Sequence, residues 1–210
     1  MRGEEAGRQQ AFPGARVDAF EYVMVLVSIV IGLAITLLLN AVAAGVHRLR
    51  GHGEPLRLEA VYLLWVGTVL VWLVSFWWWE FKFQEIETAW SFGLYLFIIS
   101  YAVALFLLAA VLVPSRMVGV DDSYAYFMDG RRWFFVGLIL VVGLDTVDSF
   151  LKGTDWGLRP IFLLQSGVYV AAATVGMLST RRSVQLAGAA IAFSAQVVYM
   201  FREVGVLGSW

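Results

Sequence analysis

The chain has 210 residues, of which 60% are hydrophobic and 15% are charged, and its net charge is −1. This composition is more apolar than that of an ordinary globular domain, and with a near-neutral charge no basic field points to nucleic acid. The sequence contains no cysteine, which excludes disulfides, iron–sulfur clusters and thiolate metal sites. No other cofactor or metal motif is present, so we expect neither.

Six apolar stretches follow one another along the chain. Each is long enough to cross a bilayer, because about 20 residues of helix span the ~30 Å hydrocarbon core. They are continuously apolar, which favours helices over the alternating strands of a membrane barrel. We therefore predict an all-α polytopic membrane protein, a bundle of six transmembrane helices with spans of about 22–46, 60–79, 89–114, 133–151, 160–180 and 183–201.

One transmembrane domain, residues 20–203, is expected to account for most of the chain. Residues 1–19 are polar and lack an apolar period, so they are predicted to form a disordered tail, and residues 204–210 a short second tail. Residues 121–133 resemble a separate interfacial helix that ends at Gly130.

The orientation follows from the arginine clusters. An even number of spans places both termini on one side of the membrane. The pairs Arg48/Arg50 and Arg181/Arg182 flank spans on the other side. Because short cytoplasmic loops carry excess Arg and Lys, we expect both termini to be extracytoplasmic.

Polar residues recur at helical spacing in the first, fifth and sixth spans. Rows of this kind either line a pore or allow helices to pack closely and form interhelical hydrogen bonds. We expect them to face the interior of the bundle, and the candidates are Ser28, Thr36, Asn40, Gln165, Gln185, Gln196 and Tyr199.

The second span is rich in tryptophan, with Trp72 followed by the consecutive Trp77, Trp78 and Trp79. Tryptophan favours the membrane–water interface, so an anchoring belt is one interpretation. Three consecutive residues point around most of a helical turn, so at least one of them should face protein. Beside Glu80, that side chain could also bind an organic cation through its ring face.

The fourth span contains two acids, Asp145 and Asp148. An acid within a membrane span is costly, and is by default a candidate functional group that faces protein or water. Lys152 follows Asp148 by four residues, so a packing ion pair near the helix end is the alternative. Glu21, Glu80 and Glu203 are expected at the same membrane face, where a ring of acids would concentrate cations.

Several short segments resemble a group of hypothetical bacterial multi-pass membrane proteins. The similar segments are Phe20-Glu21-Tyr22, Ile31-Gly32-Leu33-Ala34, Phe76 to Trp79, Tyr126-Phe127 and Arg132-Trp133-Phe134-Phe135. No function is assigned to that group, so the resemblance implies only a multi-pass protein of the bacterial inner membrane.

Two function classes remain. The first is a cation or proton conduit or transporter that uses the acids of the fourth span, with the other acids at its mouth. The second is a non-catalytic accessory or assembly subunit of a larger membrane complex. An enzyme is not expected, because the chain lacks the common hydrolase, metalloprotease and phosphate-loop motifs. The expected partners are the lipid bilayer and a homo-oligomer or larger membrane complex, and no nucleic acid.

Overall fold

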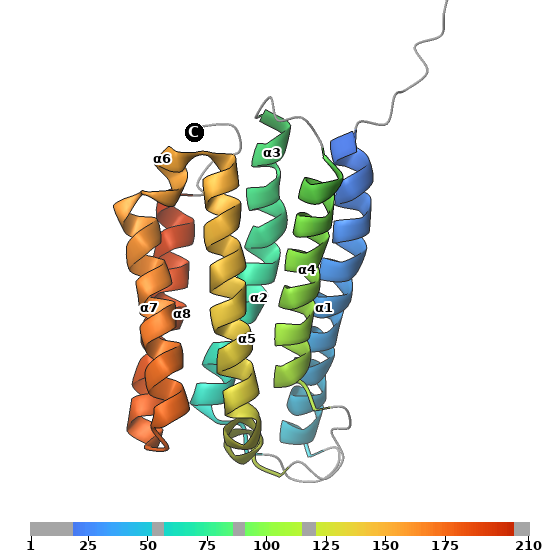
Figure 1. The fold of residues 1–210 in the computed structure, drawn as a ribbon. Coiled ribbons are helices and arrows are strands. Elements are labelled where there is room, and N and C mark those ends of the chain that lie inside the picture. Colours follow the sequence, from blue (N-terminus) through green and yellow to red (C-terminus); the bar gives the residue numbers. More distant parts are fainter. Residues whose placement is uncertain (1–18, 52–56, 86–90, 115–120, 204–210) are drawn as a thin grey trace, which may run out of the picture.

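The computed structural model describes residues 19–51, 57–85, 91–114 and 121–203, and these are folded as a bundle of helices (Figure 1). Six helices of the described residues are long and apolar enough to cross a membrane, which confirms the predicted fold class. They are α1 (Ala19–Leu49), α2 (Ala60–Glu80), α4 (Phe92–Leu112), α5 (Ser123–Lys152), α7 (Pro160–Leu178) and α8 (Arg182–Glu203). Two single-turn helices, α3 (Lys82–Glu85) and α6 (Thr154–Gly157), join them.

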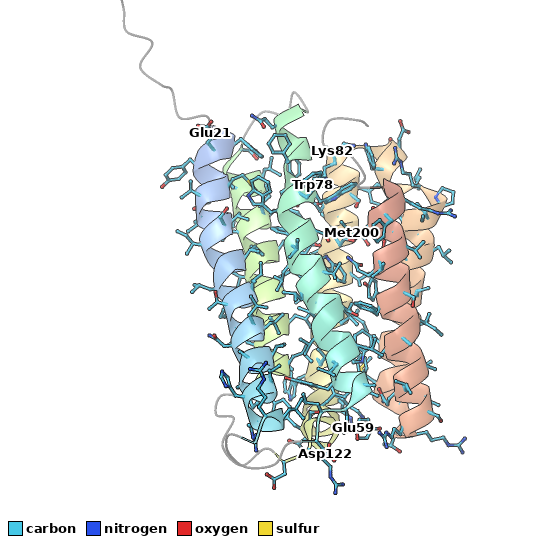
Figure 2. The ribbon with its side chains drawn as sticks, turned by 180° about the vertical axis from the view of Figure 1, so that it is seen from behind. Glu21, Glu59, Trp78, Lys82, Asp122 and Met200 are labelled. Carbon is cyan, nitrogen blue, oxygen red and sulfur yellow. The ribbon has the colours of Figure 1, made fainter. Side chains whose placement is uncertain are left out.

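The long helices form a closed ring. Helix α1 packs against α4, which packs against α5; α5 contacts α7, α7 contacts α8, α8 contacts α2, and α2 returns to α1. Helix α2 also contacts α4 and α5 across the ring. The start of α1 and the end of α8 lie at one end of the bundle together with α3 and α6, and this end is called the terminal face below (Figure 1). The other end, which holds Glu59 and Asp122, is called the opposite face (Figure 2).

Local capping explains where several helices begin. The Ser91 hydroxyl accepts a hydrogen bond from the backbone N–H of Leu94 at 3.1 Å and caps α4. The Asp122 carboxylate accepts bonds from the backbone N–H groups of Tyr124 and Ala125 and caps α5. Helix α7 has Pro160 in its first turn, where a missing N–H costs nothing.

The prediction of a separate interfacial helix that ends at Gly130 is wrong. Helix α5 continues through Gly130 from Ser123 to Lys152. A glycine in a helix interior costs only about 1 kcal/mol. The continuous helix offsets this cost because it packs the Phe127 ring against Phe134 and Phe135, with centroid distances of 5.6 and 5.9 Å.

The half of the bundle near the opposite face has an aromatic core. The indole of Trp65 on α2 contacts the rings of Phe134 and Phe135 on α5 edge to face, at 5.1 and 5.5 Å. Gly176 of α7 lies directly over Phe135, so close that a Cβ at this position would overlap the ring. The interior is therefore filled by side chains here, and the polar residues of the core lie mainly in the other half.

Candidate functional site

A buried acid–lysine–acid cluster lies at the terminal face, where α2 and α5 end. The Lys152 ammonium donates to Glu80 Oε1 at 2.9 Å and to Asp148 Oδ2, and the side chains of all three residues are fully buried. Asp148 and Lys152 meet because they are one helical turn apart on α5. Glu80 reaches them from the last residue of α2. The packing ion pair suggested by the sequence therefore exists, with a second carboxylate added to it.

Tryptophan side chains enclose this cluster. Trp79 donates from Nε1 to Asp148 Oδ2 at 3.0 Å, and the Lys152 ammonium lies 5.2 Å from the centre of the Trp79 ring. Trp156 of α6 packs edge-on against Trp79 at 5.2 Å, and Lys82 lies over the face of Trp156. The structure thus places two lysines of the chain itself beside Trp79 and Glu80, where the sequence suggested an organic cation.

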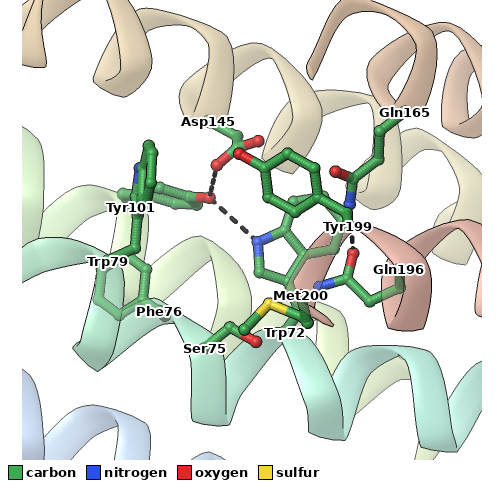
Figure 3. A pocket seen from close by; sticks show the side chains of 10 residues that line it. All are labelled: Trp72, Ser75, Phe76, Trp79, Tyr101, Asp145, Gln165, Gln196, Tyr199 and Met200. Atoms are coloured by element: carbon green, nitrogen blue, oxygen red, sulfur yellow. Dashed lines mark hydrogen bonds between the residues drawn. The ribbon is translucent and has the colours of Figure 1, made fainter. Parts of the chain in front are cut away.

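Asp145 lies deeper in the bundle than the acid–lysine–acid cluster. It precedes Lys152 by seven residues, about 10 Å along α5. Its Oδ1 accepts a hydrogen bond from the Tyr101 hydroxyl of α4 at 2.9 Å, and that hydroxyl accepts one from Trp72 Nε1 of α2 at 3.2 Å (Figure 3). Among the described residues, no lysine or arginine forms an ion pair with Asp145. Asp145 is half-buried, whereas Asp148 is fully buried.

A small cavity lies beside Asp145. Its volume is about 30 Å³, and one water needs roughly 10–15 Å³ on this measure, so about two waters or one small ion would fill it. Side chains from α2, α4, α5, α7 and α8 line it, most of them aromatic or amide groups (Figure 3): Trp72, Ser75, Phe76, Trp79, Tyr101, Asp145, Gln165, Gln196, Tyr199 and Met200.

Two amides that line the cavity, Gln165 and Gln196, continue the polar network to the hydroxyl of Tyr169. Gln196 Oε1 of α8 accepts from Gln165 Nε2 at 2.5 Å and from the Tyr169 hydroxyl at 2.6 Å, both on α7. The Tyr169 ring lies 4.9 Å from that of Trp72. Gln165, Gln196 and Tyr199 therefore face the bundle interior, as the sequence pattern predicts.

Gln185 also faces protein, but far from the cavity. Its Nε2 donates to the backbone carbonyls of Gly176 and Ser179, at 2.8 and 2.7 Å. These bonds close the end of α7, where helical carbonyls lack partners. Gln185 therefore joins two helices and lines no cavity with Asp145.

The expectation that the polar row of the first span faces the bundle interior is wrong for the single chain. Ser28, Thr36 and Asn40 are exposed on the outer side of α1, and the Thr36 hydroxyl bonds back to Gly32 O at 2.7 Å. Helical spacing identifies a face but does not say which side it turns to, because lipid and protein are both apolar surroundings.

The expected ring of acids is not formed by the acids whose side chains are described. Glu21 is exposed on the outer side of α1, and Glu80 is buried in the ion cluster. Glu203 ends α8, but its side chain lies outside the described residues. The prediction that at least one of the consecutive tryptophans faces protein is confirmed, since Trp79 is buried, Trp78 half-buried and Trp77 exposed.

Several residues of the site were missed by sequence reasoning. Tyr101 resembles an ordinary interfacial or core aromatic in the sequence, and its hydroxyl partner lies 44 residues away. Trp156 and Lys82 belong to short connecting helices, so their packing over the cluster follows from the fold alone. The one available signal was a hydroxyl-bearing residue, Tyr101, in the middle of an apolar span.

No family model, curated protein or solved structure matches this chain. The fold and the apolar helices define it as a multi-pass, all-α membrane protein that associates with the lipid bilayer.

Proposed function

We propose that this protein moves protons or small inorganic cations across the bacterial inner membrane, with Asp145 as the binding group. One observation carries the proposal. Asp145 belongs to a membrane-spanning helix, its carboxylate lines a cavity with room for about two waters, and it forms no ion pair with a described lysine or arginine. Acids at such positions are rare and usually mark an ion or proton path.

The charges around the cavity favour a cationic ligand. Three carboxylates, those of Glu80, Asp145 and Asp148, lie in this half of the bundle, and the single ammonium of Lys152 bonds to Glu80 and Asp148. Asp145 has a hydroxyl donor, Tyr101, but no ion pair with a described lysine or arginine. An uncompensated charge in a membrane span costs about 2.5–3.5 kcal/mol, and a bound proton or cation removes that cost.

The size of the cavity limits the ligand. A volume of about 30 Å³ admits a proton carried by water or one small ion, and it is far below the 300–1,000 Å³ typical of sites for organic ligands. The half of the bundle beyond Asp145 is filled by Trp65, Phe134 and Phe135. The arrangement therefore supports a carrier or a proton relay that changes conformation, rather than an open pore.

Orientation and assembly belong to the same proposal. With both termini extracytoplasmic, Asp145 is nearer the outer surface and its ligand leaves towards the cytoplasm through the aromatic half. A homo-oligomer is the expected assembly, because a bundle of six helices buries only part of each helix.

The test is ion flux into liposomes that contain the purified protein. Proton and K⁺ or Na⁺ gradients are applied to wild type, to Asp145→Asn, and to Asp155→Asn as a matched control. Asp155 is an exposed acid of α6 at the same face, so its replacement changes net charge equally without touching the cavity. We expect Asp155→Asn to conduct like wild type, and Asp145→Asn to lose flux while keeping its helical content and size in detergent. Flux that is equal in all three proteins, or absent from folded wild type under every gradient, would refute the proposal.

A second candidate function, an accessory subunit of a larger membrane complex, is favoured by α1. Its outer face exposes Ser28, Thr36 and Asn40 around Gly32, where no atom would meet an added Cβ. Polar rows with a central glycine are typical of helix–helix contacts in membranes. Purification in mild detergent distinguishes the two functions: a stoichiometric partner that Gly32→Leu releases would support the subunit role, and a single species would oppose it.

A further inference from the structure

An apolar groove runs along the outer surface between α7 and α8, on the half nearer the terminal face. Its volume is about 470 Å³. Leu164 and Val198 stand at its sides with 69% and 50% of their surfaces exposed, so the groove opens towards the surrounding bilayer. The lining residues are Pro160, Ile161, Leu164, Gln165, Val168, Ala195, Val198, Tyr199 and Arg202.

The groove has a charged end and an apolar length. Arg202, in the last turn of α8, lines it at the terminal face. No ion pair joins Arg202 to a carboxylate of the described residues. From Pro160 to Val168 the groove follows nine residues of α7, a rise of about 12 Å, which is close to half of the ~30 Å hydrocarbon core. An arginine at headgroup depth above one leaflet of apolar groove is complementary to an anionic phospholipid.

We propose that this groove binds an anionic phospholipid, with one acyl chain along Leu164, Ala195 and Val198 and the phosphate at Arg202. The small side chain of Ala195 provides the space for the chain. The guanidinium supplies charge-assisted hydrogen bonds to phosphate oxygens, for which its planar geometry is well suited.

The groove and the Asp145 cavity share a wall. Gln165 and Tyr199, seen in Figure 3 at the wall of the cavity, also line the groove, so an acyl chain in the groove packs against both side chains. Binding of the lipid therefore stabilises the closed position of Gln165 and Tyr199 and slows access to Asp145. This regulatory effect rests on the proposed function, whereas the binding of lipid does not.

Binding is tested by native mass spectrometry of the full chain with phosphatidylglycerol or phosphatidylcholine of the same acyl chains. Wild type should retain one phosphatidylglycerol with about fivefold preference, the value expected for one arginine near an anionic headgroup. Arg202→Gln should lose the preference, and Ala195→Leu should lose the bound lipid of either kind. The matched control is Ala187→Leu, which lies on the same helix but lines a different groove, and it should bind like wild type.

Three results would overturn the proposal: equal retention of the two lipids by wild type, an unchanged preference in Arg202→Gln, or a change of oligomeric state in Ala195→Leu. The last would show that the groove receives a second copy of the chain. Flux in liposomes with and without phosphatidylglycerol tests the regulatory half separately. We expect the flux of wild type to rise when the anionic lipid is omitted. The flux of Arg202→Gln should be the same with and without that lipid. Lipid binding without any effect on measurable flux would refute regulation, whereas absent flux would refute the proposed function instead.

Discussion

The indole N–H of Trp79 donates a 3.0 Å hydrogen bond to Asp148 Oδ2, the same oxygen that receives the ammonium of Lys152. This oxygen thus joins the end of α2 to the last turns of α5, 69 residues later in the chain. The second oxygen of each carboxylate, Asp148 Oδ1 and Glu80 Oε2, has no hydrogen-bond partner among the described residues. The cluster is therefore held by few donors, and the loss of any of them should have a measurable cost.

Replacement of Trp79 by Phe should lower the free energy of unfolding by about 1–2 kcal/mol, because the buried carboxylate of Asp148 loses a donor while the aromatic volume is largely kept. Trp77→Phe is the control on the same helical turn. Trp77 is 41% exposed, so its change should stay within about 0.5 kcal/mol. Denaturant unfolding in detergent measures both, and equal effects would contradict the assigned role of the Trp79 indole.

Lys152→Met should be strongly destabilising, by about 3–5 kcal/mol, since it leaves Glu80 and Asp148 buried without their shared cation. Methionine replaces the four-atom aliphatic part of the lysine side chain and removes only the ammonium, so packing changes little. The triple variant Lys152→Met/Glu80→Gln/Asp148→Asn removes all three charges and should recover most of the stability. Thermal unfolding in detergent distinguishes the two variants. If the triple variant were no more stable than the single one, packing rather than charge would explain the loss.

Tyr101→Phe removes the hydroxyl that connects Trp72 to Asp145. We expect a loss of about 1–2 kcal/mol of stability, and a severalfold lower flux in liposomes because the Asp145 side chain is no longer held beside the cavity. Tyr62→Phe is the matched control, since its hydroxyl donates to the carbonyl of Leu112 at 3.1 Å, away from Asp145. It should lose similar stability at unchanged flux. Equal flux in the two variants would argue against a positioning role for Tyr101.

Two glycines of α7 should respond in opposite ways to alanine. At Gly176 an added Cβ would overlap the Phe135 ring, so Gly176→Ala should cost about 1–3 kcal/mol. At Gly167 no atom lies within 4 Å of the added Cβ, and helix propensity alone should make Gly167→Ala neutral or stabilising by up to about 1 kcal/mol. Unfolding in detergent gives both values. A neutral Gly176→Ala would mean that Phe135 moves freely in the core.

The fold was predictable because length and continuous apolar character determine which segments can span a bilayer. The last turns of α5 were also predictable, since the spacing of Asp148 and Lys152 places them on one face. Glu80 could not be assigned to the same cluster, because its partner lies 72 residues away and depends on which helices become neighbours. For α1, the spacing of Ser28, Thr36 and Asn40 was correct as a face, but periodicity does not distinguish a lipid-facing side from a protein-facing one.

The apolar packing in the interior of the bundle determines where a membrane potential acts. Between Asp145 and the opposite face, the interior holds apolar side chains such as Leu138, Phe134 and Trp65. A membrane potential falls mainly across the region that excludes water, and it acts with about 2.3 kcal/mol per elementary charge for each 100 mV. In the proposed transport, the step from Asp145 towards the opposite face would cross this apolar region and the part of the potential that falls across it. The rate of that step should accordingly depend on the membrane voltage.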